Sequence, residues 1–196
     1  MELYIVRHGK TIWNKERRLQ GSIDIELAEE GIEAAEILHD QLISSNITFD
    51  RIYSSPLQRA KKTAEIIRGL NDTDIIIDQR LREISFGVEE GAFYADWDRP
   101  DSPYFPFFNR PGDYVPPEKG ESLEQLFERT KNFIQQEIEP QYESAKKILI
   151  VAHGALNSAI MCYLENRTKA DFWGPGLQQN CQATVFTYDG KIWIKK

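Results

Sequence analysis

Cysteine is scarce in this chain of 196 residues, and long apolar runs are absent. Cys162 and Cys181 do not form a Cys-x-x-Cys pair, and two cysteines are too few for a disulfide framework in a chain of this length. No apolar run approaches the length of a membrane span. The amino-terminal stretch, with Glu2 and Arg7 in it, lacks the basic region and apolar core of a signal peptide. We therefore expect a protein of the reducing cytoplasm that does not bind membranes.

An excess of positive charge is also missing, because 24 Lys and Arg residues stand against 31 Asp and Glu residues and leave a net charge of −7. This balance argues against binding to nucleic acid or to an anionic membrane surface. It does not exclude an anionic small molecule, because a pocket can be locally positive. The hydrophobic content of 41% is ordinary for a globular protein, and the length suits one domain. We predict that residues 1–196 form a single domain.

Histidine is rare as well, and two of the three histidines occupy equivalent positions. His8 closes the apolar run 2–7, His153 closes the apolar run 148–152, and a glycine follows each of them. Both runs are short and partly β-branched, so they are predicted to be buried strands. Ligands of an open parallel sheet bind beyond the carboxyl ends of its strands, so two parallel neighbours would bring these histidines to one pocket. His39 lies on a predicted amphipathic helix and is assigned no role.

Apolar runs alternate with stretches of helical period along most of the chain. The predicted strands are residues 2–7, 51–54, 74–78 and 148–152, and the predicted helices are residues 27–43, 55–68, 122–142 and 155–164. We expect Ser55 to cap the second helix and Pro56 to be its first residue. A hairpin of residues 183–188 and 191–194 with the turn Asp189-Gly190 ends the chain. This alternation predicts an α/β fold, a three-layer α/β/α sandwich around a mostly parallel central sheet.

One region interrupts the alternation. Residues 87–120 contain six prolines and eight aromatic side chains. So many aromatic residues would not be left in water, and the region is therefore not a disordered linker. We predict an inserted cap that folds over the edge of the sheet, with a few inward side chains contributing to specificity.

Guanidinium groups are predicted beside the two histidines. Arg7 precedes His8, and Arg59 lies one turn into the helix that follows residues 54–56. Arginine matches the geometry of phosphate with two parallel donors, and the first turn of a helix adds partial positive charge. These groups indicate a site for a phosphate-like anion.

Neutral donors and one acid complete this set. Asn14 and Gln20 offer neutral donors from the loop after the first strand, and Glu83 supplies a carboxylate. Histidine, arginine and an acid together support covalent phosphoryl transfer. The imidazole attacks phosphorus, the arginines hold the charged oxygens, and the acid protonates the leaving oxygen.

Six blocks of the sequence resemble the histidine phosphatase superfamily, the phosphoglycerate mutase-like proteins. The blocks are residues 3–14, 18–21, 54–64, 81–87, 120–122 and 151–154. A lone Arg-His-Gly would be a weak signal, but six blocks in the family's order over nearly the whole chain are a specific one. The Arg-Leu-Gln-Gly loop at 18–21 is similar to that of the small broad-specificity phosphatases.

The resemblance implies roles for individual residues. His8 would be the nucleophile that becomes phosphohistidine, and Glu83 would protonate the leaving group and then activate water. The phosphoryl group would be ringed by Arg7, Arg59 and His153. The expected substrate-binding residues are Asn14, Thr11, Gln20, Gly21 and Gly154. The resemblance implies no metal and no cofactor, and a small-molecule phosphate monoester as the partner.

Three other functions are compatible with parts of this sequence to different degrees. Gly9-Lys10-Thr11 is similar to the end of a P-loop, but that motif needs a glycine five positions before Gly9, where Tyr4 stands. A zinc hydrolase that uses the two histidines and Glu83 stays open, although Arg7 would repel the cation. A phosphate-binding module without catalysis also stays open.

Within the superfamily, several positions differ from the glycolytic mutase pattern. Residues 155–158 lack the arginine found after His-Gly in that branch, and residues 88–91 lack a tryptophan common there. Lys10 stands where an acid often follows Arg-His-Gly. We therefore predict a phosphomonoesterase for small phosphorylated metabolites, with a cofactor-dependent phosphoglycerate mutase as the alternative.

Overall fold

The computed structural model describes all residues from Met1 to Lys196 and contains one mixed sheet of six strands. The strands are β1 (Glu2–Arg7), β2 (Arg51–Ser54), β3 (Ile75–Ile77), β4 (Lys147–Ala152), β5 (Ala183–Tyr188) and β6 (Trp193–Lys195). Their order across the sheet is β3-β2-β4-β1-β5-β6. The first four strands are parallel to one another, β5 is antiparallel to β1, and β6 is antiparallel to β5. The predicted carboxyl-terminal hairpin is thereby confirmed, but residues 189–192 connect its strands in place of the predicted two-residue turn, and β6 begins at Trp193 rather than at residue 191.

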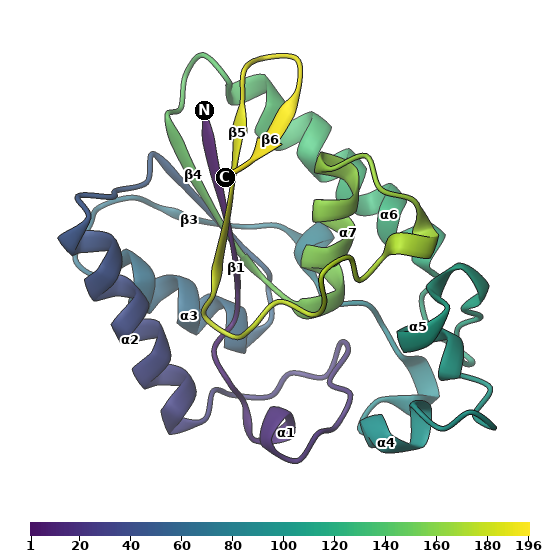
Figure 1. The fold of residues 1–196 in the computed structure, drawn as a ribbon. Coiled ribbons are helices and arrows are strands. Elements are labelled where there is room, and N and C mark those ends of the chain that lie inside the picture. Colours follow the sequence, from purple (N-terminus) through teal and green to yellow (C-terminus); the bar gives the residue numbers. More distant parts are fainter.

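Helices cover both faces of this sheet (Figure 1). α2 (Glu29–Ser44) and α3 (Gln58–Arg68) lie on one face, and α6 (Leu123–Phe133) and α7 (Gly154–Leu164) lie on the other. Alternate residues of β1 divide between the two hydrophobic clusters, with Tyr4 packing beside the first helix pair and Ile5 beside the second. The predicted three-layer α/β/α sandwich is confirmed.

The two strands that end in histidine lie side by side at the centre of the sheet. β1 and β4 are parallel, and Arg7 is opposite Ala152. The backbone N–H of His8 donates to the carbonyl oxygen of Ala152 at 2.9 Å, which extends the pairing to the point where both chains leave the sheet. The residues after the strands, His8 and His153, therefore emerge at the same edge.

Two predicted helix boundaries are wrong. α3 begins at Gln58 with Leu57 as its N-cap residue, so Pro56 is outside the helix and Ser55 is not its cap. The hydroxyl of Ser55 instead lies 2.7 Å from Nε2 of His153. The predicted helix 122–142 is regular only to Phe133 and continues as a π turn and then a 3₁₀ turn, Ile134–Ile138 and Glu139–Gln141. The second turn contains Pro140, which cannot donate a helical hydrogen bond.

The aromatic segment 87–120 is ordered and joins the main core. It contains α4 (Tyr94–Trp97) and α5 (Phe105–Asn109), which lie together at one end of the molecule (Figure 1). Trp97 and Phe107 are each 1% exposed and belong to the same hydrophobic cluster as Ile5 of the central strand. One further short helix, α1 (Ile12–Lys15), follows β1. No helix has the length and apolar character needed to span a membrane.

Candidate active site

The structure brings the two strand-terminal histidines into contact. The ring centroids of His8 and His153 are 5.2 Å apart, and the ring planes are inclined by 58°. His8 is 3% exposed and His153 is fully buried. Their closeness follows from the register of β1 and β4, which places the two chain exits next to each other.

Backbone contacts fix which nitrogen of His8 is free. Nδ1 lies 2.7 Å from the carbonyl oxygen of Gly9, and a carbonyl oxygen can only accept, so Nδ1 carries the proton of the neutral ring. Nε2 then keeps its lone pair. Burial holds the pKa of His8 well below the usual 6.5, and the charges of Arg59 and Arg7 lower it further. The ring is therefore neutral at pH 7, as a nitrogen nucleophile must be.

His153 presents the opposite nitrogen. Its Nε2 is 2.7 Å from Oγ of Ser55, whereas its Nδ1 is buried and has no protein partner. Oγ of Ser55 accepts a hydrogen bond from the N–H of Leu57, so the hydroxyl proton is available for Nε2. A hydroxyl that donates to Nε2 leaves the ring proton on Nδ1. Burial lowers the pKa of His153 well below 6.5, with Arg59 and His8 as further causes.

Two arginines lie beside these rings and are held by backbone carbonyl groups. Nη1 of Arg7 donates to the carbonyl oxygen of Gln178 at 2.8 Å. Nη1 and Nη2 of Arg59 donate to the carbonyl oxygens of Ile23 and Gly21 at 2.7 and 2.8 Å. The Nε atoms of both arginines are buried without a protein partner. Burial lowers the pKa of Arg59 to about 10, so this group still carries its charge at pH 7.

Glu83 is fixed by the first turn of α7. Its Oε1 accepts from the N–H groups of Ile84 and Leu156 at 2.9 and 3.0 Å, and its Oε2 accepts from the N–H of Ala155 at 3.1 Å. The first N–H groups of a helix have no partner within the helix, and this carboxylate satisfies two of them. His153 is the N-cap residue of the same helix, so the acid and the imidazole share one support.

Most of the predicted site residues surround one narrow cavity of about 40 Å³, whereas the fully buried His153 lies beside His8 and is not on the cavity wall. His8, Glu83, Gln20, Gly21 and Gly154 are on its wall with both arginines. The remaining lining residues are Leu19, Phe86, Tyr94, Phe107, Phe108, Ala155, Trp173 and Leu177. The wall is therefore charged on the side of the strand ends and largely apolar on the side of the aromatic segment.

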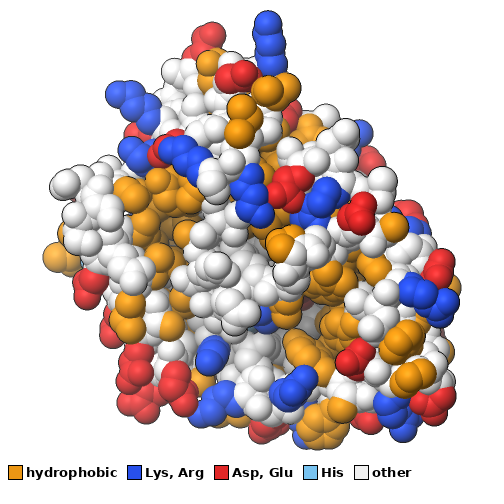
Figure 2. Space-filling view, viewed as in Figure 1, with side chains coloured by type: hydrophobic (Ala, Val, Ile, Leu, Met, Phe, Trp, Pro, Cys, Tyr) orange, Lys and Arg blue, Asp and Glu red, His pale blue; other side chains and the backbone are white.

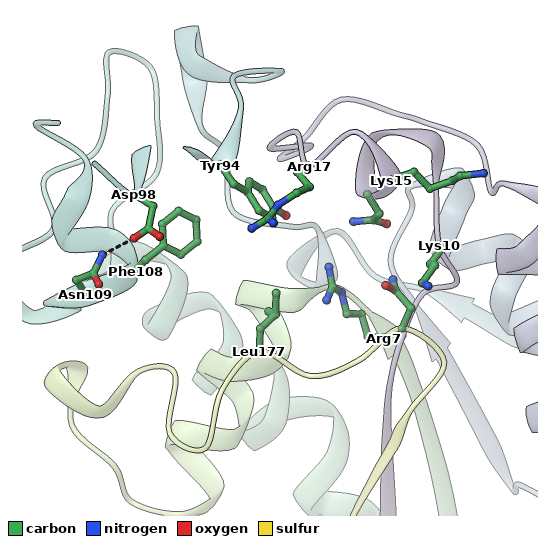
Figure 3. A pocket seen from close by; sticks show the side chains of 11 residues that line it. Arg7, Lys10, Lys15, Arg17, Tyr94, Asp98, Phe108, Asn109 and Leu177 are labelled. Carbon is green, nitrogen blue, oxygen red and sulfur yellow. Dashed lines mark hydrogen bonds between the residues drawn. The ribbon is translucent and has the colours of Figure 1, made fainter. Parts of the chain in front are cut away.

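Asn14 and Thr11 are placed differently. Asn14 lines a second, wider cavity of about 590 Å³ that shares part of its wall with the narrow one (Figure 3). Thr11 lines neither cavity. It is fully buried, and its Oγ1 accepts from the N–H of Asn14 and donates to Oδ1 of Asn14, both at 3.2 Å. The structure assigns the hydroxyl of Thr11 to the cap of α1, and a contact between Thr11 and substrate stays a prediction.

Sequence reasoning missed several residues that support the site. Ser55 was expected to cap a helix, and its contact with His153 depends on tertiary structure. Asn180 donates from Nδ2 to the carbonyl oxygen of His8 at 2.7 Å, and the side chain of Gln178 bonds to the carbonyl oxygen of Ile5 at 2.9 Å. These two residues lie in the loop before β5, where no motif marks them.

Comparisons with known proteins agree with this geometry. The profile of the "Histidine phosphatase superfamily (branch 1)" matches residues 3–196. The solved structure of Bacillus stearothermophilus YhfR is 32% identical with a TM-score of 0.89, and the match covers 99% of this chain and 94% of that one. The phosphoserine phosphatase of Entamoeba histolytica, solved in complex with 3-phosphoglyceric acid, is 27% identical with a TM-score of 0.84, over 99% and 94% of the two chains.

A mutase is also among the relatives. The 2,3-bisphosphoglycerate-dependent phosphoglycerate mutase of Parvibaculum lavamentivorans is 33% identical over 164 residues, which are 81% of this chain and 78% of that protein. The relatives thus comprise phosphatases of small metabolites and mutases. The chain belongs to the histidine phosphatase superfamily, branch 1, and is a phosphoryl-transfer enzyme of the metal-independent type found in that family.

Proposed function

We propose that this protein is a phosphomonoesterase that hydrolyses small phosphorylated metabolites through a phosphohistidine at His8. The observation that carries the proposal is the hydrogen bond of 2.7 Å between Nδ1 of His8 and the carbonyl oxygen of Gly9. It leaves Nε2 as a nucleophile in a buried pocket that Arg7 and Arg59 make positive. A neutral imidazole and fixed cations are the groups that attack on a phosphoryl anion requires.

In the first step, Nε2 of His8 attacks phosphorus. A P–N bond forms as the bond from phosphorus to the ester oxygen breaks, and the leaving oxygen takes a proton from Glu83. The phosphoryl oxygens accept hydrogen bonds from Arg7, Arg59 and Nδ1 of His153, which stabilise their negative charge during the whole step. All these donors are anchored by protein contacts before substrate arrives, so little reorganisation is needed.

In the second step, water replaces the departed alcohol. Glu83, now ionised, takes a proton from the water. The water oxygen bonds to phosphorus as the P–N bond breaks. Inorganic phosphate and a neutral imidazole result. The same carboxylate serves as acid and then as base, which its fixed position on the first turn of α7 allows.

Two observations support hydrolysis over mutase chemistry. Ala155 follows His153-Gly154, where the resemblance to glycolytic mutases would place an arginine. Phosphatase names also occur among the structures to which this chain is similar, including the phosphoserine phosphatase of Entamoeba histolytica.

The test is a panel of phosphomonoesters incubated with the protein in the presence of a chelator, with inorganic phosphate as the readout. We expect steady phosphate release from several esters and a covalent phosphoryl adduct on His8, detected by rapid-quench mass spectrometry. Interconversion of 2- and 3-phosphoglycerate without phosphate release would assign the mutase reaction instead. Loss of activity on chelation would argue for a metal enzyme.

A further inference from the structure

The wider cavity opens from the phosphoryl pocket and concentrates positive charge. The two cavities share Arg7, Tyr94, Phe108 and Leu177 as wall residues, so a group that extends from the narrow cavity enters the wider one. Four cationic residues line the wider cavity against a single acid. Figure 2 shows Lys and Arg side chains gathered around α1 on this face. In a chain with a net charge of −7, such a concentration is a local exception.

Two of these cationic side chains, those of Lys10 and Arg17, have no ion-pair or hydrogen-bond partner within the protein. Lys15 donates to Glu30 at 2.7 Å and is thereby neutralised. Asp98, the one acid, accepts from Asn109 at 2.7 Å on the opposite wall (Figure 3). Arg7, the fourth cation, also lines the narrow cavity and is assigned to the phosphoryl group. The positive charge left for another group in the wider cavity therefore belongs to Lys10 and Arg17.

The backbone of Lys10 is fixed against α2. Its carbonyl oxygen accepts from the N–H of Ala28 at 2.8 Å. A Cβ atom at Gly31 would come within 2.1 Å of that oxygen, so only glycine permits this contact. The same closeness exists at Gly9, whose Cβ would lie 2.4 Å from the carbonyl oxygen of Gly31. Lys10 therefore starts from a defined point on the cavity wall.

The backbone of Arg17 is fixed on the facing side by the end of α1. Arg17 directly follows the C-cap residue Glu16, and its φ angle of +58° is the left-handed conformation common at that position. Its N–H donates to the carbonyl oxygen of Asn14 at 3.2 Å, and its carbonyl oxygen accepts from the N–H of Tyr94 at 2.9 Å. Both partners line the same cavity, so Arg17 also starts from a defined point on its wall.

We propose that Lys10 and Arg17 form a second anion subsite, which selects phosphomonoesters whose leaving group carries a further negative charge. The proposal rests on the proposed function and deepens it. The phosphoryl group occupies the narrow cavity, and a carboxylate or second phosphate on the leaving group meets the two free cations. A leaving group without charge forms no such contact. Lys10 and Arg17 are thus specificity-determining residues for the reaction.

The matched ligands are 3-phosphoglycerate and glycerol 3-phosphate, which differ only by a carboxylate in place of a hydroxymethyl group. Their affinities are measured by calorimetry on a His8→Ala protein, which holds the esters without turnover. We expect 3-phosphoglycerate to bind about tenfold more tightly, the strength of one or two charge-assisted contacts in a partly open site. Fructose 1,6-bisphosphate against fructose 6-phosphate tests a second phosphate as the anion in the same way.

Variants then assign the preference to the two residues. Lys10→Gln with Arg17→Gln in the His8→Ala background should remove the tenfold preference and leave affinity for glycerol 3-phosphate within about twofold. Lys10→Arg, which keeps the charge, should retain most of it. Lys61→Gln, an exposed lysine of α3 outside both cavities, serves as the control and should change nothing.

The outcomes separate this proposal from the proposed function. Equal affinity for the matched esters, or a preference that survives the double variant, would overturn the subsite. Because the readout is binding to a protein that cannot turn over, it stands even if the wild-type protein releases no phosphate. In wild-type protein, phosphate release from glycerol 3-phosphate tests the proposed function alone, since that ester lacks the second anion.

Discussion

His8 and His153 arise from the same local sequence, a buried strand followed by His-Gly, yet the structure uses their rings in opposite ways. His8 bonds through Nδ1 to the next backbone carbonyl oxygen and keeps Nε2 free. His153 bonds through Nε2 to Ser55 and keeps Nδ1 free. Both rings are buried and have a lowered pKa, so neither burial nor charge distinguishes them.

The difference comes from what surrounds each strand exit. After His8 the chain turns into a loop, and the carbonyl oxygen of Gly9 reaches back to the ring. After His153 the chain enters α7 at once, and Gly154 is already part of the helix. The ring of His153 is therefore held by a side chain from another segment, Ser55. A repeated sequence pattern therefore supplies two adjacent imidazoles, and the element that follows each one decides which ring nitrogen is left without a protein partner.

The largest expected effect comes from a change at His8, the first of the two histidines. His8→Gln removes the only ring in the pocket with a free Nε2, and turnover should fall by about 10⁴-fold or more, since no other group there can form the covalent intermediate. The phosphoryl adduct should also vanish in mass spectra. His39→Gln, on α2 and away from both cavities, is the matched control and should stay close to wild type. A His8→Gln protein that still turned over rapidly would contradict the assignment.

His153→Gln should have a smaller effect of a different kind. This change removes a donor to the phosphoryl oxygens and leaves the nucleophile, so we expect kcat to fall by about 10² to 10³-fold, as for loss of one preorganised donor. The adduct on His8 should still form, only more slowly. Rapid-quench measurement of its rate distinguishes the two histidines. Absence of any adduct in this variant would mean that the two roles are not separate.

Ser55→Ala tests the support of the second ring. Without the hydroxyl at 2.7 Å, Nε2 of His153 loses its partner, and kcat should fall about tenfold while KM changes little. Ser54→Ala is the matched control, because Ser54 is equally buried but its hydroxyl donates to the carbonyl oxygen of Ser55. Ser55→Thr, which restores a hydroxyl, should recover activity. Equal losses in both alanine variants would indicate a general structural effect.

The smallest expected effect concerns stability and treats the two rings alike. Both have a pKa well below 6.5 when folded, whereas an unfolded imidazole binds a proton near 6.5. The unfolded state therefore takes up protons as the pH falls through 6.5, and the folded state does not. Each ring should lower the free energy of unfolding by about 1 kcal/mol between pH 6.5 and 5.5. Urea unfolding should show the loss, and His8→Gln should remove about half of it; an unchanged slope would place the His8 pKa near its usual value.

The strands and the helix faces follow from the sequence because a buried strand and an amphipathic helix each repeat their apolar residues at a fixed period. The boundaries of α3 and α6 do not. At Ser55, local capping preference competes with a hydrogen bond to His153, and the distant partner prevails. Near Pro140, the helical pattern continues in the side chains after the backbone has lost its regular hydrogen bonds.

The candidate reacting groups can be proposed from the sequence for a reason that does not apply to the residues that support them. His8, Arg7 and Glu83 lie in short motifs whose chemistry requires those residue types. Asn180 and Gln178 support the site through contacts with β1 that span about the whole chain, and many other polar residues would look the same in the sequence. Thr11 also lies in a motif block, and the sequence did not show that its hydroxyl caps α1.

The aromatic segment has a consequence for attempts to redirect this enzyme. Phe107 lines the reaction chamber and is also packed into the cluster that contains Ile5 of the central strand. The same side chain therefore shapes the cavity and contributes to the stability of the fold. Exchange of the segment for that of another enzyme would disturb both at once. Lys10 and Arg17 are exposed and lie outside that cluster, so substitutions at these two positions do not remove any of its packing contacts.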